Sequence, residues 1–186
     1  MQNRTLTRTL CEGALFLAAA LALSYLKIPI GLVFGGFGGS VDLVMLPLLV
    51  YAAKWGTGRG VTAGLLFGTM KFFLGGGVAV NWQSMLLDYS LAYAAVGLGG
   101  LLGKSRHPLT LGAILGSLCR FGVHYLSGVT IYAQYMPEVF MERTMTSPAI
   151  YSLLYNGSYM LPNTVLAIAL CAFLEKPLRK WLTQKS

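Results

Sequence analysis

One stretch decides how this chain folds: Ser117-Leu-Cys-Arg-Phe-Gly-Val-His-Tyr-Leu-Ser-Gly-Val-Thr-Ile-Tyr-Ala-Gln-Tyr135. It begins inside a long apolar run and ends in an aromatic, polar segment. Its polar residues recur at helical intervals and would share one helix face; they are Ser117, Arg120, His124 and Ser127. A charge at membrane depth costs about 2.5–3.5 kcal/mol on insertion scales, so such residues line cavities or pair. The pattern predicts a helix whose polar face looks into a small-molecule pocket.

The composition is that of an integral membrane protein. Of the 186 residues, 55% are hydrophobic and only 11% are charged, whereas soluble domains carry about 25% charged residues. The length suits one compact bundle, so we expect a single membrane domain over residues 1–186 and no soluble enzyme domain. The net charge of +8 is attributed to basic cytoplasmic loops rather than to nucleic-acid binding.

Six apolar segments predict an all-α, six-helix transmembrane bundle. They cover approximately residues 9–27, 41–54, 60–75, 84–103, 109–130 and 148–173. The second and third are short, and neither is certain to cross fully, because a spanning helix needs about 20 residues.

Basic residues cluster where a six-span bundle would place its loops and ends on one side. They are Arg4, Arg8, Lys54, Arg59, Lys104, Arg106, Lys176, Arg179, Lys180 and Lys185. The connections on the other side carry Lys27 and Arg143. Because positively charged loops stay in the cytoplasm, both termini are predicted to be cytoplasmic and the pocket to face outward.

The first segment carries a stripe of small residues on one helical face, formed by Ala14, Ala18 and Ala22. This stripe favours a retained helix over a cleaved signal peptide, because small residues allow close helix packing. Packing inside the bundle and docking on another protein both stay open. The glycine-rich segment 29–40 that follows suits either a loop folded over a cavity or an ordinary connector.

Motifs for catalysis, metals and nucleotides are absent from the sequence. Gly56-Thr-Gly-Arg-Gly60 is too short for a phosphate-binding loop and lacks its lysine. His107 and His124 have no metal-ligand spacing, and no nucleophile elbow frames a serine. We therefore expect no catalytic residue, metal or cofactor. A small intramembrane enzyme that uses Asp88 and His124 as acid and base remains an alternative, as does a structural subunit without a ligand.

Three predicted spans bring polar and aromatic residues to one outer depth. These residues are Asp88, Tyr89, His124, Tyr132, Tyr135, Tyr151, Tyr155 and Asn156. A carboxylate, an amide, an imidazole and several aromatic rings suit a flat, polar, cationic ligand. Taken alone, Tyr155 or Tyr159 fits an interfacial aromatic belt better, and Asp88 could instead pair with Arg120.

At these residues the chain resembles the substrate-binding S component of energy-coupling factor (ECF) vitamin transporters, most closely the thiamine-specific family. The resemblance runs through nearly the whole chain. Its most specific parts are the spacings from His124 to Tyr132 and from Tyr151 to Asn156.

The resemblance implies a high-affinity thiamine-binding subunit of an ATP-driven importer in a bacterial cell membrane, with a pocket capped by the loop between the first two spans. It assigns the aminopyrimidine to Asp88, Tyr151 and Asn156, stacking to Tyr132, and the thiazolium side to Tyr89, His124 and Gly128. It also implies that the stripe of Ala14, Ala18 and Ala22 docks on a membrane-embedded coupling subunit driven by two ATPases. An S component for another small vitamin or a pyrimidine precursor is the alternative.

The chain departs from the family pattern at three places. Asp88 stands where the family has Glu, so its carboxylate reaches one methylene less. Tyr132 stands where the family has Trp, which gives a smaller stacking face. A tryptophan of the capping loop is absent, with Gly38 at that place and Phe37 beside it.

Overall fold

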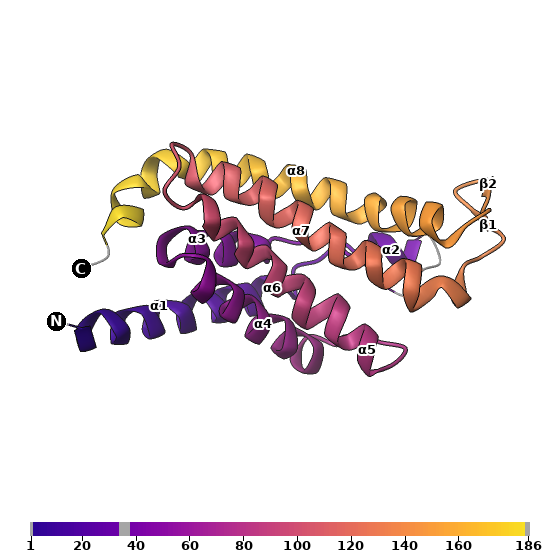
Figure 1. The fold of residues 1–186 in the computed structure, drawn as a ribbon, viewed down its shortest axis with the longest axis horizontal. Coiled ribbons are helices and arrows are strands. Elements are labelled where there is room, and N and C mark those ends of the chain that lie inside the picture. The colour runs from indigo at the N-terminus through magenta and orange to yellow at the C-terminus, as the bar shows by residue number, and fades with distance from the viewer. Residues whose placement is uncertain (1, 34–37, 185–186) are drawn as a thin grey trace.

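The computed structural model describes residues 2–33 and 38–184 and is mostly helical (Figure 1). In chain order its elements are α1 (Gln2–Leu23), α2 (Ile30–Val33), α3 (Met45–Trp55), α4 (Thr57–Leu74), α5 (Trp82–Met85), the π-helix η1 (Leu86–Leu91), α6 (Ala92–Val96), the 3₁₀ helix η2 (Gly97–Leu102), α7 (Pro108–Thr130), the 3₁₀ turn η3 (Tyr132–Tyr135), the strands β1 (Val139–Phe140) and β2 (Arg143–Thr144), and α8 (Pro148–Thr183). Because α5, η1, α6 and η2 follow one another without a break, the described residues form six main helical segments, as predicted.

Four of these segments are long and apolar enough to cross a membrane: Arg4–Leu23, Trp82–Leu102, Pro108–Thr130 and Pro148–Thr183. α3 has only 11 residues, which agrees with its short apolar run. Ten of those residues are buried, so α3 is a central core helix rather than a lipid-facing span. α4 adds 18 residues.

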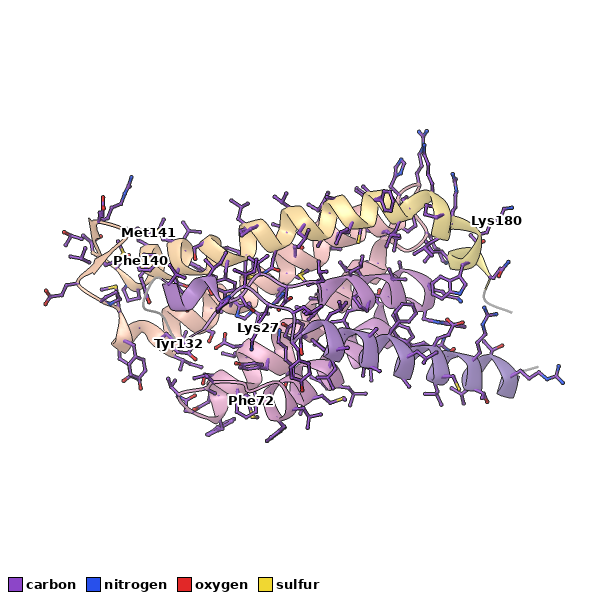
Figure 2. The ribbon with its side chains drawn as sticks, turned by 180° about the vertical axis from the view of Figure 1, so that it is seen from behind. Lys27, Phe72, Tyr132, Phe140, Met141 and Lys180 are labelled. Atoms are coloured by element: carbon purple, nitrogen blue, oxygen red, sulfur yellow. The ribbon has the colours of Figure 1, made fainter. Side chains whose placement is uncertain are left out.

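The two chain ends lie at the same end of the bundle (Figure 1). The β1–β2 hairpin, α2 and α5 lie at the opposite end, and α7 and α8 run side by side between the two ends. Figure 2 shows the same separation in its labelled side chains, with Tyr132 and Phe140 at one end and Lys180 at the other. This arrangement is the one that an even number of crossings produces.

The chain between α1 and α3 folds into the bundle. Ile28 pairs with Val41 in an isolated antiparallel bridge, so the segment turns back on itself. Asn163 of α8 accepts a hydrogen bond from the Asp42 N–H at 2.9 Å and donates one to the Ser40 carbonyl at 2.6 Å. Non-helical backbone is tolerated at membrane depth only where it is buried in protein or lines a water-filled cavity. The Asn163 side chain therefore satisfies backbone hydrogen-bonding groups that lipid could not satisfy.

Two glycines let α4 approach the 82–102 segment closely. A Cβ at Gly64 would lie 2.1 Å from the Tyr93 carbonyl oxygen, and one at Gly68 would lie 2.2 Å from the Tyr89 carbonyl oxygen. Both neighbours are backbone atoms, which cannot move aside as a flexible side chain can. The close contact also brings Lys71, one turn further along α4, to the hydroxyl of Tyr93.

We expect Gly64→Ala to destabilise the bundle by about 1–3 kcal/mol, the usual cost of overpacking. Gly122→Ala is the matched control, because a Cβ at Gly122 of α7 meets no atom within 4 Å. Replacing a mid-helix glycine by alanine is favourable by about 0.5–1 kcal/mol. Thermal unfolding in detergent should give a lower melting temperature for Gly64→Ala and an equal or higher one for Gly122→Ala. Equal melting temperatures for the two variants would contradict the close contact.

Glu12 ties α1 to α3 at the end of the bundle that holds the termini. Its carboxylate accepts hydrogen bonds from Lys54 Nζ at 3.0 Å and from Trp55 Nε1 at 2.8 Å. The Lys54 side chain is wholly buried, and its ammonium lies 3.5 Å from the ring centroid of Trp181 on α8. Charged contacts thus join α1 to α3 and α3 to α8.

The alanine stripe of α1 is not part of this packing. Ala14, Ala18 and Ala22 are all exposed. Because these side chains are exposed, the interpretation in which the stripe packs inside the bundle is wrong. Docking on another protein remains a prediction.

Candidate ligand-binding site

A cavity of about 250 Å³ opens at the end of the bundle opposite the termini. Small-molecule sites commonly measure about 300–1,000 Å³, so this volume suits a ligand at the small end of the range. The cavity is lined by all seven residues that the family resemblance assigned to binding: Asp88, Tyr89, His124, Gly128, Tyr132, Tyr151 and Asn156. The structure thus brings the predicted residues together, and their contact with a ligand stays a prediction.

The π-helix η1 places both Asp88 and Tyr89 on the cavity wall. Consecutive residues of an α-helix point in different directions, and one-turn π-helices occur frequently at functional sites. Asp88 accepts a hydrogen bond from Ser127 Oγ at 3.0 Å, and its other oxygen lies 3.1 Å from His124 Nδ1. The α7 face predicted from the sequence therefore holds the carboxylate in place.

Asp88 does not pair with Arg120, which corrects that alternative. Arg120 instead donates from Nη2 to the Tyr93 hydroxyl at 3.2 Å. The same hydroxyl accepts from Lys71 Nζ at 2.5 Å, and Lys71 also contacts Asp42 Oδ2 at 3.0 Å. Arg120, Tyr93 and Lys71 all line the cavity. We call Asp42, Lys71, Tyr93 and Arg120 the floor network.

Asn156 and Gly128 join α7 to α8 at the cavity. Asn156 Nδ2 donates to the Ser152 carbonyl at 3.0 Å, and Asn156 Oδ1 accepts from the Tyr159 hydroxyl at 2.6 Å. A Cβ at Gly128 would lie 2.1 Å from Ser152 Oγ. Glycine is therefore needed at 128 for helix packing, whatever else it contacts. The amide of Asn156 keeps one free lone pair on Oδ1.

Aromatic rings form the outer wall. Tyr151 stacks on Tyr155 with centroids 5.7 Å apart, and Tyr155 meets Tyr159 edge-to-face at 5.9 Å. Tyr155 and Tyr159 both line the cavity, so the interfacial-belt interpretation of these two is wrong. Burial raises the pKa of Tyr132, in the turn after α7, to about 12. Its ring is therefore uncharged at neutral pH.

The segment after α2 closes over these rings. The Tyr155 hydroxyl accepts a hydrogen bond from the Gly38 N–H at 3.0 Å and donates one to the Gly38 carbonyl. Gly39 has φ +94°, and a Cβ there would lie 2.5 Å from the Tyr159 ring. Gly38 and Gly39 line the cavity, so this part of segment 29–40 is a cavity wall rather than an ordinary connector. Phe37 lies outside the described residues.

Sequence reasoning missed Lys71, Tyr93 and Lys27, which also line the cavity. Lys71 lies within an apolar run, and a charged residue at that depth was the available signal.

No tryptophan lines the cavity among the described residues; Trp82 is 67% exposed. The described residues also contain no group of His, Cys, Asp and Glu that could hold a metal ion.

Comparisons with known proteins agree on one family. Residues 10–182 match the family model described as thiamine transporter protein. The thiamine transporter ThiT of Bacillus subtilis is 33% identical, with 91% of each chain covered. ThiT of Lacticaseibacillus paracasei is 27% identical, with 94% of this chain and 90% of the relative covered.

A solved structure of ThiT from Listeria monocytogenes shares the fold, with a TM-score of 0.78 at 24% identity. That match covers 95% of this chain and 97% of the other. With four helices that can span a membrane, the chain is a multi-pass protein of a bacterial cell membrane. The family match extends over almost the whole bundle and includes all seven predicted binding residues. It shows that this chain belongs to the thiamine transporter protein family.

Proposed function

We propose that this chain binds thiamine with high affinity as the S component of an ECF-type importer. The observation that carries the proposal is the cavity itself, in which Asp88 faces a wall of tyrosines. A carboxylate accepts hydrogen bonds from an amino group, and aromatic faces hold flat rings and positive charge. Thiamine offers an aminopyrimidine, a cationic thiazolium and a short hydroxyethyl arm, which match these groups.

The orientation of the ligand follows from the position of its partners. The aminopyrimidine contacts Asp88, Tyr151 and the free lone pair of Asn156 Oδ1, and Tyr132 stacks on it. The thiazolium lies near Tyr89, His124 and Gly128. The hydroxyethyl arm extends from the thiazolium toward the floor network.

The test is isothermal titration calorimetry of the purified protein in detergent. The ligands titrated are thiamine, riboflavin and a free aminopyrimidine precursor. We expect thiamine to bind most tightly, because only thiamine satisfies both the carboxylate and the thiazolium side. Tighter binding of riboflavin would remove the thiamine assignment, and tighter binding of the precursor would favour the pyrimidine alternative. Mass spectrometry of ligand retained through purification separates all of these from a structural subunit without a ligand.

As a member of a transporter family, the chain is a transporter subunit and not an enzyme. The energy for uptake then comes from other subunits. We assign ATP hydrolysis to two ATPases that act through a membrane-embedded coupling subunit. The exposed face of Ala14, Ala18 and Ala22 is the proposed docking surface, because small residues let helices approach closely. Both termini face the cytoplasm in this proposal, and the cavity opens outward.

We expect Ala18→Trp to abolish ATP-driven uptake by the full complex while thiamine affinity of the isolated protein stays within about twofold, because the side chain is exposed and outside the cavity. Val165→Trp is the matched control: Val165 of α8 is also exposed and apolar, at 60%, but lies outside the stripe. This variant should keep both affinity and uptake. Normal uptake by Ala18→Trp, or joint loss of affinity and folding, would contradict docking at this face.

A further inference from the structure

The cavity carries more cationic than anionic side chains. Lys27, Lys71 and Arg120 line it, and among the described residues Asp88 is the one carboxylate that does so. Lys71 is neutralised by Asp42, which lies behind it in the floor network. Arg120 has no carboxylate oxygen within 4.0 Å of its nitrogens anywhere in the described chain. Its positive charge is therefore uncompensated.

Arg120 also has unused hydrogen-bonding capacity. The residue is only 5% exposed, and its Nε and Nη1 are buried without a hydrogen-bond partner. Its one hydrogen bond goes to the Tyr93 hydroxyl, and the Tyr93 ring lies beneath the guanidinium carbon at 4.4 Å. Ser117, three residues earlier on the same face of α7, likewise has a buried hydroxyl without a partner.

A buried cation without a counterion is costly in a membrane protein, because the charge has lost its water. A cationic ligand in the same cavity increases that cost, since one lining carboxylate then faces the ligand and Arg120 together. Lys71 adds a second cation on the other side of the Tyr93 hydroxyl and has one donor beyond its contacts to Asp42 and Tyr93. The floor is thus a place where positive charge and free donors gather.

We propose that Arg120 and Lys71 form a site for a small inorganic anion, the size of chloride, which binds at the cavity floor together with the ligand. The anion accepts hydrogen bonds from the guanidinium and the ammonium and neutralises the charge that the ligand brings. The inference rests on the proposed function in one respect, namely that the ligand is a cation. A phosphate ester on the ligand's own alcohol would bring the same chemistry to this floor.

The experiment measures thiamine affinity by calorimetry in sodium chloride and in sodium gluconate at equal pH and ionic strength, because gluconate is too large for the site. We expect affinity to be about tenfold weaker in gluconate, the lower end of what hydrogen bonds to charged groups contribute. Arg120→Gln should remove the difference, and Arg120→Lys should keep part of it. Arg59→Gln is the matched control, because Arg59 is exposed and lies over Trp55, outside the cavity lining; it should behave as the parent protein.

Thiamine monophosphate distinguishes the two sources of the anion. Affinity for it that is independent of chloride shows that the ligand's phosphate fills the site, and chloride-dependent affinity shows that a free ion does. Equal thiamine affinity in chloride and gluconate, or a dependence that survives in Arg120→Gln, would overturn the proposal.

Failure of the proposed function would give a different result, because thiamine would then bind in neither chloride nor gluconate. The anion site is then decided by bromide-soaked crystals, where an anomalous peak beside Arg120 supports it and a bare floor refutes it. The same crystals decide the case if Arg120→Gln does not fold.

Discussion

Asp88→Asn is expected to weaken thiamine binding roughly 10- to 150-fold, the factor that corresponds to about 1.5–3 kcal/mol for hydrogen bonds to a charged group. Asparagine keeps the size of the side chain, and its oxygen can still accept from Ser127 Oγ, so the fold should hold. What is lost is the negative charge that faces the aminopyrimidine and the thiazolium in the proposed binding mode. Calorimetric titration of the folded variant measures the effect.

The control is Ser127→Ala, which removes a hydrogen bond to the carboxylate but leaves its charge. It should cost only about fivefold, equivalent to the roughly 1 kcal/mol of an ordinary hydrogen bond. Asp88→Asn should weaken the binding of thiamine more than it weakens the binding of an uncharged analogue that has a neutral ring in place of the thiazolium. If thiamine binds Asp88→Asn as tightly as the parent protein, the carboxylate serves only to position His124.

Asp42→Asn is expected to produce the largest loss of stability, about 3–5 kcal/mol, because it leaves the partner of a buried ion pair uncompensated. The Asp42 and Lys71 side chains are only 1% and 11% exposed. Asp42 also accepts from the Val44 N–H at 3.3 Å ahead of α3. Thermal unfolding in detergent, without ligand, is the measurement.

The double variant Asp42→Asn, Lys71→Met provides the control. Replacing both members of a buried pair is often close to neutral, whereas removing one is not. The double variant should therefore recover most of the melting temperature that Asp42→Asn loses. If the double variant is as unstable as the single one, the damage comes from the lost contacts around α3 rather than from the stranded charge of Lys71.

The sequence was informative where the signal is local. Apolar run length gives the six helical segments, and the spacing of Arg120, His124 and Ser127 gives the buried face of α7. Hydrophobic periodicity depends only on neighbours a few residues apart, so it can be read without tertiary structure. The short run at α3 likewise indicated that this segment was not certain to cross the membrane fully.

The remaining features depend on distant partners. The Asp42–Lys71 pair joins residues 29 positions apart, and the support of Asp42 by Asn163 spans 121 positions. Nothing near Asp42 in the chain indicates that its backbone lies inside the bundle. Tyr159 was misjudged for the same reason, because tyrosine at a helix end and tyrosine in a pocket are identical in sequence.

The absence of a lining tryptophan has a consequence for spectroscopy. Trp55 and Trp181 lie beside Lys54, at the far end of the bundle from the cavity, and Trp82 faces outward. The fluorescence of these indoles should therefore change little when a ligand binds in the cavity. Tyr132→Trp would place a single indole in the cavity wall, where the proposed stacking of the aminopyrimidine should quench its emission. Tryptophan at this position would thus turn the chain into an optical sensor, with background emission from Trp55 and Trp181 at the far end of the bundle and from the outward-facing Trp82.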